Sequence, residues 1–198
     1  MIETFIHQEI PAEALRSNIS IITGDNTVLI SAGNSKISAS AVAGCRYASE
    51  LTFKPIAVCF LRPQINILRF LNKNEYFTLS YFSPEYQYIL NSFGLGRSSE
   101  KITPMSTPAG NIYYPQADLV FECRKITDPE LILSSEIQKI MVSEKLSIYP
   151  GHETPRMFLG EITGGWHRVL QSLASDHLGK LLPKSSTRPA GFVIRQLK

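Results

Sequence analysis

Residue types that catalyse reactions on their own are sparse in this sequence and do not fall into recognised catalytic spacings. The four histidines form no Cys-x-x-Cys or His-Glu-x-x-His pattern, so no metal site is expected. No Gly-x-Ser-x-Gly segment is present. Cys59 and Cys123 fall within strand-like apolar runs and are expected to be inert core thiols. Cys45 lies beside the cation Arg46, which leaves a reactive thiol open, but a structural role is favoured.

Three segments have a composition suited to binding an anion or a flat ring. Residues 94–99 (Gly-Leu-Gly-Arg-Ser-Ser) offer backbone N–H groups, a guanidinium and two hydroxyls, although glycine-rich helix exits are also common without a ligand. Residues 62–64 (Arg-Pro-Gln) join a buried strand to a predicted helix start, where N–H groups and an arginine would converge. Small residues at 38–44 would admit a flat ligand or a phosphate close to the backbone, or pack against another strand.

Short apolar runs bounded by turn residues predict a mainly β fold with a few helices, most simply a β-barrel. The run at 55–61 is apolar throughout, which predicts burial on both faces, inside a barrel or under a dimer partner. The other predicted strands are 19–23, 28–32, 36–42, 76–82, 117–125 and 156–163.

Helices are predicted at two places with clear boundaries. One starts at Pro63 and runs to Lys73. The other is capped by Ser83, has Pro84 at its first position and ends at Gly94. A weaker helix is predicted at 135–145, and the proline-rich residues 103–116 are predicted to form a loop. The apolar face of the second helix comprises Tyr86, Ile89, Leu90 and Phe93.

Composition excludes several classes of protein. The 198 residues are 43% hydrophobic and 19% charged, which is typical of a globular protein and not of a disordered or fibrous one. No apolar run approaches the roughly 18 residues that a membrane span needs. The first residues are mixed and acidic, unlike a secretion signal. Three cysteines suit a reducing compartment, so a cytoplasmic location is predicted.

Charge divides the chain into two parts. The net charge of +3 is too small to indicate nucleic-acid binding. Residues 163–198, however, hold six cations and one acid, a net charge of +5 that leaves −2 on the rest. Residues 164–198 are therefore expected to form a basic C-terminal extension. The extension either attracts an anionic cofactor, substrate or partner, or is simply solvated.

Six segments, taken in order along the chain, carry a resemblance to a known family: 28–33, 38–44, 54–64, 74–86, 114–125 and 149–162. Together they resemble the flavin reductase-like, FMN-binding split-barrel family, and in particular its flavoredoxin-like branch. The resemblance covers roughly residues 11–163 and implies a flavin reductase-like domain at 1–163. It implies a six-stranded Greek-key split barrel that forms a homodimer and holds FMN near the dimer interface.

The same resemblance implies an FMN-binding oxidoreductase, in the first place a flavin reductase that uses NAD(P)H. Two alternatives stay open: a non-catalytic flavin-binding or electron-carrier protein, and a degenerate, cofactor-free interaction module. No catalytic residue is identified, and neither a nucleic acid nor a membrane is an expected partner. The implied cofactor-binding residues are Ser38, Ala39, Ser40, Ala41 and Val42, then Arg62, Pro63 and Gln64, then Phe93, Gly94 and Arg97.

The sequence also departs from the family pattern. The tryptophan of the small-residue segment is Ala41 here, and the cation that follows Arg-Pro-Gln is Ile65. One hypothesis is that Arg168 or Arg188 replaces the lost cation, from the same or the partner subunit.

Overall fold

The computed structural model describes residues 4–11, 15, 27–48, 55–63, 65–94, 102–128, 134–135, 137–140, 142 and 155–171. The strand predicted at 19–23 lies outside these residues. Of the helix predicted at 135–145, every described residue is helical.

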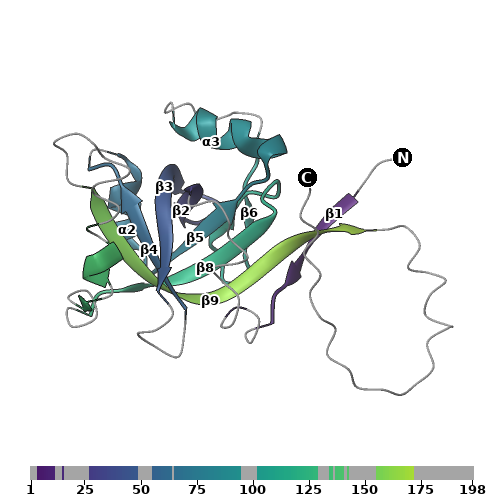
Figure 1. Ribbon diagram of the computed structural model, residues 1–198. Helices are drawn as coiled ribbons and strands as arrows, with labels where there is room; N and C mark the ends of the chain where they lie inside the picture. The colour runs from purple at the N-terminus through teal and green to yellow at the C-terminus, as the bar shows by residue number, and fades with distance from the viewer. Residues whose placement is uncertain are drawn as a thin grey trace, which may run out of the picture.

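A closed antiparallel barrel of six strands forms the body of the protein (Figure 1). The strands follow the order β9-β4-β3-β2-β5-β8, and β8 pairs with β9 to close the ring. Since β2, β3 and β4 are consecutive neighbours and β5 returns beside β2, the topology is a Greek key, as predicted. The strands are β2 (Thr27–Gly33), β3 (Ser38–Ala48), β4 (Ile56–Leu61), β5 (Tyr76–Tyr81), β8 (Leu119–Ile126) and β9 (Arg156–Gln171).

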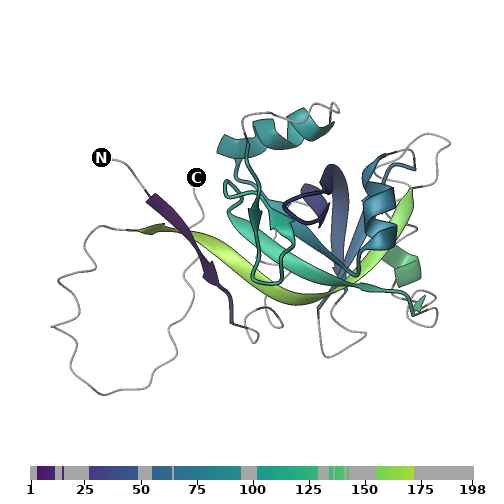
Figure 2. The same cartoon turned by 180° about the vertical axis from the view of Figure 1, so that it is seen from behind.

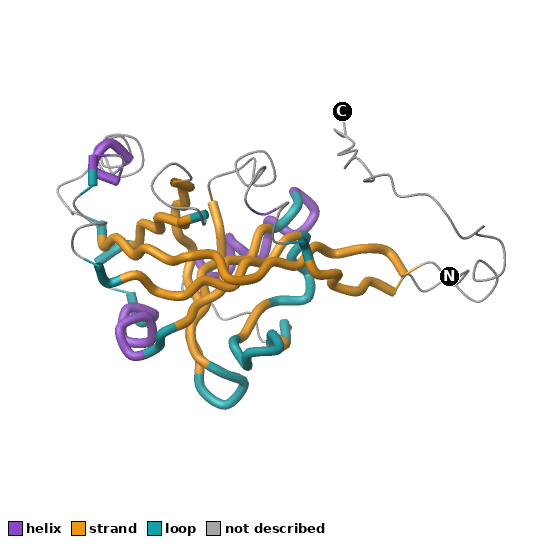
Figure 3. The backbone as a smooth tube through the Cα atoms, turned by 90° about the horizontal axis from the view of Figure 1, so that it is seen from below, coloured by secondary structure: helices purple, strands orange, loops and turns teal. Residues whose placement is uncertain are grey.

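β9 is twice as long as the strand predicted at 156–163, and it continues beyond the barrel. Its second half pairs in antiparallel register with β1 (Thr4–Glu9), a strand that the sequence analysis did not identify. The two strands form a ribbon that extends away from the barrel (Figures 1 and 3). β9 therefore crosses residue 163 without interruption, and the division of the chain at that residue stays a prediction.

β4 is buried on both faces within one chain, which confirms the prediction for 55–61. Alternate residues of the strand, such as Cys59 and Leu61, belong to the core inside the barrel. The residues between them, such as Val58 and Phe60, pack outside it against Ile137 and Leu159. The strand therefore needs no partner subunit to cover it, so its apolar sequence is no argument for the predicted homodimer. Light scattering tests the oligomeric state directly.

The helix predicted from Pro63, α2 (Ile67–Lys73), begins four residues later than predicted. Leu68 and Arg69 donate their N–H groups to the carbonyls three residues earlier, at 3.2 and 3.3 Å, so residues 65–66 form a tight turn first. At the other end, the ammonium of Lys125 on β8 donates to the carbonyls of Leu71 and Asn72, at 2.7 and 3.0 Å. This cation satisfies the helix C-terminus and fixes α2 to the barrel.

The second helical segment comprises a 3-10 turn, η1 (Pro84–Tyr86), and α3 (Gln87–Gly94), which lies over one end of the barrel (Figure 2). Its predicted apolar face is confirmed, since Ile89 and Leu90 are buried and pack with the half-buried Tyr86 and Phe93. The loop predicted at 103–116 instead contains a small hairpin, β6 (Met105–Ser106) and β7 (Ile112–Tyr113).

The β2–β3 turn gives a direct test of local geometry at Gly33. Its φ is +111°, and a Cβ there would lie 2.3 Å from the carbonyl oxygen of Ile37, a backbone atom. Gly110 also has a positive φ, +89°, but a Cβ there meets nothing within 4 Å. We expect Gly33→Ala to lower the free energy of unfolding by about 1–3 kcal/mol more than Gly110→Ala, because only the first adds a clash to the backbone strain. Urea denaturation of both variants measures the difference, and equal losses would contradict the clash.

Candidate functional site

A cavity of about 350 Å³ opens where β3 separates from β4. β3 pairs with β4 from Gly44 to Ala48, whereas between Ser38 and Ala43 its described partner is β2 alone. In an antiparallel strand, backbone groups point alternately to the two edges. Half of the N–H and C=O groups of residues 39–43 therefore face away from β2 and have no ladder partner among the described strands.

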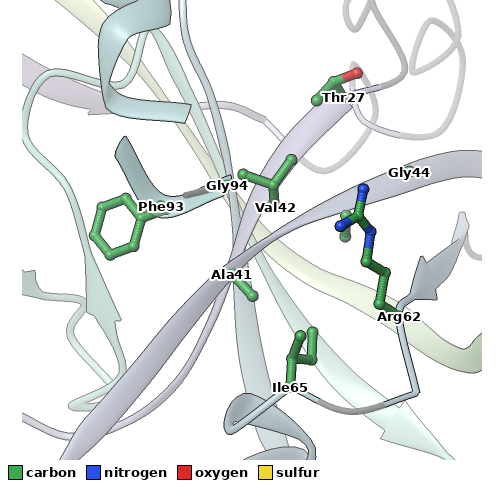
Figure 4. A pocket seen from close by; sticks show the side chains of 9 residues that line it. Thr27, Ala41, Val42, Gly44, Arg62, Ile65, Phe93 and Gly94 are labelled. Atoms are coloured by element: carbon green, nitrogen blue, oxygen red, sulfur yellow. The ribbon is translucent and has the colours of Figure 1, made fainter. Parts of the chain in front are cut away.

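Side chains from several elements surround this edge (Figure 4). Phe93 and Gly94, at the end of α3, lie on one side of Val42, and Arg62, the first residue after β4, lies on the other. The small side chain of Ala41 leaves the strand accessible between them. The full lining is Thr27, Ala41, Val42, Ala43, Gly44, Arg62, Ile65, Phe93 and Gly94.

Arg62 is the charged residue of this lining, and its side chain is exposed. The ion pairs found among the described residues join Arg124 to Glu161 and Arg168 to Asp118, so Arg62 has no carboxylate partner there. A guanidinium offers five N–H donors in a planar fork that fits the oxygens of a phosphate or carboxylate. The cavity therefore combines an open strand edge, an aromatic ring and one cation available to an anion.

The structure brings together Ala41, Val42, Arg62, Phe93 and Gly94, which come from all three predicted segments. Of the other predicted site residues, Ser38, Ala39, Ser40 and Pro63 do not line the cavity, and Gln64 and Arg97 lie outside the described residues.

Four lining residues were missing from the predicted site: Thr27, Ala43, Gly44 and Ile65. Ala43 and Gly44 end the small-residue segment, and Ile65 directly follows residues 62–64, so continuity along the chain would have found these three. Thr27 pairs with Gly44 across β2 and β3, and only the strand register reveals it.

Successive side chains along β3 point to opposite faces of the sheet, so the predicted site residues of this strand lie on two faces. Ala39 and Ala41 pack against the core inside the barrel, whereas Val42 packs with α3. The hydroxyl of Ser40 is hydrogen-bonded within the protein, 2.8 Å from the hydroxyl of Ser31 and 3.0 Å from that of Tyr114. Ser40 therefore has its hydroxyl engaged within the protein and does not line the cavity.

Arg168 does not supply a second cation to the cavity from within one subunit. Its Nε donates to Oδ1 of Asp118 at 3.1 Å, and its guanidinium lies 4.6 Å from the centre of the Tyr86 ring. The other oxygen of Asp118 accepts the N–H of Ser83, so this ion pair fixes the start of η1 to β8 and β9. Arg188, the other hypothetical replacement, lies outside the described residues.

All three cysteines are buried and unbridged, as expected of core thiols. The sulfurs of Cys45 and Cys59 are 3.9 Å apart, and this contact together with burial raises the pKa of Cys59. Burial also raises the pKa of Cys123. Thiols held protonated in this way are poor nucleophiles.

A smaller hollow of about 190 Å³ lies where β1 meets the β6–β7 hairpin. Burial lowers the pKa of His7 in its wall, which keeps the imidazole neutral at pH 7, and Nε2 of that ring donates to the carbonyl of Ala117 at 2.9 Å. The hollow therefore lacks the cation that the larger cavity has. Its lining is His7, Ser106, Thr107, Pro108, Tyr113, Val120 and Trp166.

The described part of the chain has no group of three or more His, Cys, Asp or Glu side chains placed to hold a metal ion. None of the helices described has the length and hydropathy that crossing a membrane requires.

Comparison with known proteins identifies the fold. No family model matches the chain, and no curated protein matches it. Among solved structures, an FMN-binding domain of a flavin reductase-like enzyme from Shewanella baltica has a TM-score of 0.56 at 15% identity, over 84% of this chain and 78% of that one. An NADH:FAD oxidoreductase from Streptomyces globisporus has a TM-score of 0.53 at 12% identity, over 78% and 87%. A flavoredoxin from Methanosarcina acetivorans gives 0.50 at 14%, over 72% and 68%.

At these identities the likeness establishes the fold. The chain folds as the split barrel of the FMN-binding, flavin reductase-like proteins, as the resemblance predicted.

Proposed function

We propose that this protein binds FMN in the cavity between β3, the Arg62 turn and the end of α3, and that it is a flavin reductase using NAD(P)H. The observation that carries the proposal is the edge of β3 at residues 39–43, which has no ladder partner among the described strands, with Arg62, which has no carboxylate partner among the described residues, at one end of it. The structural neighbours, named as an FMN-binding domain of a flavin reductase-like enzyme, an NADH:FAD oxidoreductase and a flavoredoxin, support a flavin as the ligand.

The shape and polarity of the cavity suit a flavin mononucleotide. An isoalloxazine ring is flat, and its pyrimidine edge alternates hydrogen-bond acceptors with an N–H donor. An unpaired strand edge offers backbone groups that alternate in the same way. The alanines at 41 and 43 allow a ring to approach that edge, Phe93 offers an aromatic contact, and Arg62 is available to the phosphate. The cavity volume of about 350 Å³ lies in the range of small-molecule sites.

The residue types that line the cavity indicate which chemistry the flavin supplies and which the chain supplies. The described lining contains no carboxylate, histidine or cysteine. A bound flavin supplies the hydride-accepting chemistry itself. What the chain contributes is binding: β3 and Phe93 orient the ring, Arg62 holds the anionic end, and the remaining side chains limit the access of water.

Titration with FMN, followed by NADH or NADPH without oxygen, tests this function. We expect the protein to change the fluorescence of FMN on binding, and NADH or NADPH to bleach the visible absorbance of the bound flavin. Binding with bleaching by dithionite but by neither nucleotide would identify a flavin carrier and contradict the reductase activity. The absence of any FMN binding at millimolar concentrations would contradict the proposal as a whole and favour a cofactor-free module.

A further inference from the structure

We propose that three linked hydroxyl groups, those of Ser31, Ser40 and Tyr114, set the position of Phe93 and so the orientation in which the cavity holds a flavin ring. The inference rests on the proposed function, because Phe93 is part of the cavity wall described above. It makes Ser31, Ser40 and Tyr114 positioning residues that act through Phe93 rather than by contact with the ligand.

The hydroxyl chain joins three segments that are distant in sequence. Ser31 on β2 and Ser40 on β3 are directly opposite in the strand register, and their oxygens are 2.8 Å apart. Tyr114 follows β7, and its hydroxyl lies 3.0 Å from Ser40 Oγ. A hydroxyl both donates and accepts, so the central hydroxyl of Ser40 can bond to both neighbours at once.

Burial at both ends makes this chain difficult to replace by water. Ser31 is 0% exposed and Tyr114 is 6% exposed, while Ser40 between them is half-buried. Burial also raises the pKa of Tyr114, so its hydroxyl stays protonated at neutral pH. Such hydrogen bonds hold the Tyr114 side chain in one arrangement, because breaking them leaves a buried hydroxyl without a partner.

The Tyr114 ring transmits this constraint to the cavity. The rings of Tyr114 and Phe93 have centroids 5.3 Å apart and an interplanar angle of 60°, within the range of favourable aromatic pairs. Phe93 packs against a cluster that includes Tyr114, Leu29 and Leu90. Since the hydroxyl end of Tyr114 is tied to β3, the ring cannot slide along its own axis, and Phe93 has a fixed surface behind it.

The central test removes the Tyr114 hydroxyl alone. We expect Tyr114→Phe to weaken the binding of FMN and of riboflavin by the same factor, about 2- to 12-fold, because the change affects the ring and not the phosphate. The visible circular dichroism of the bound flavin should change as well, which a loss of stability alone would not produce. Tyr113→Phe is the matched control, since its hydroxyl faces Met105 Sδ and its residue lies outside the cavity lining.

A double-mutant cycle shows whether Phe93 carries the effect. In a Phe93→Leu background, Tyr114→Phe should cause no further loss of flavin affinity. If Tyr114→Phe does not fold, Ser40→Ala tests the same inference, because it removes the central hydroxyl of the chain.

The outcomes are distinguishable. Unchanged affinity for both flavins and an unchanged visible spectrum in Tyr114→Phe and Ser40→Ala would overturn the inference and leave the proposed function standing. The inference would also be overturned if Tyr114→Phe lowered flavin affinity by the same factor in the unmutated chain and in the Phe93→Leu background. Failure of the unmutated chain to bind either flavin would overturn the proposed function and this inference together.

Discussion

Replacing Arg62 with alanine is expected to weaken FMN binding by about 10- to 150-fold, because a hydrogen bond to a charged group contributes about 1.5–3 kcal/mol. Arg62 is the charged residue of the cavity lining and has no carboxylate partner in the described part of the chain. Riboflavin, which has the same ring and no phosphate, should bind both forms equally. Fluorescence titration with the two flavins measures both affinities.

Two further variants of the arginines define this prediction more closely. Arg69→Ala is the matched control, since Arg69 is an exposed arginine of α2 outside the cavity lining, and it should leave FMN affinity unchanged. Arg62→Lys should give an intermediate affinity, because lysine keeps the charge but loses the planar fork. If Arg62→Ala weakened riboflavin as much as FMN, the guanidinium would not be holding the phosphate.

Local sequence patterns were sufficient for most of the barrel strands. β4 and β5 have apolar runs whose ends are marked by Pro55 and by Asn74, and the structure places both strands within one or two residues of the prediction. The same holds for α3, because a proline near its start and a helical spacing of large apolar residues act within a few turns.

The elements that the sequence did not reveal depend on distant partners. β1 exists because residues 4–9 pair with the far end of β9, more than 150 positions away. That end follows Gly164 and Gly165, which weaken a strand pattern, and beside them Thr163 of β9 is left unpaired where the register with β8 shifts between Glu122 and Cys123. The start of α2 depended on a turn at 65–66 that its apolar spacing did not indicate.

The candidate site was predictable as segments but not as side chains. Family order identified the small-residue strand, the arginine turn and the end of α3, and the structure places all three around one cavity. Position along β3 decides which residues reach it, since Ala41 to Gly44, beside the point where β3 leaves β4, line the cavity and Ser38 to Ser40 do not. This separation depends on where β3 leaves β4, which is a property of the register and not of composition.

Of the single substitutions proposed here, Phe121→Ala is expected to lower the free energy of unfolding the most, by about 3–5 kcal/mol. Phe121 is 0% exposed at the centre of the barrel, where it forms edge-to-face pairs with Tyr47 and Tyr81. For a chain of this size the loss corresponds to a fall in Tm of about 6–20 °C. Tyr88→Ala is the control, since this aromatic side chain is 53% exposed and should cost little.

The close approach of Phe121 to β9 makes a second-site test possible. A Cβ at Gly165 would lie 3.0 Å from Cδ1 of Phe121 and 2.9 Å from Cδ2 of Leu15, so Gly165→Ala alone should destabilise the barrel by overpacking. With the phenyl ring removed, one of these two obstacles is gone. The double variant should therefore lose less stability than the sum of the two single variants, as measured by urea denaturation of all four proteins. Additive losses would contradict the contact between Phe121 of β8 and Gly165 of β9, and with it the close packing of these two strands where they close the barrel.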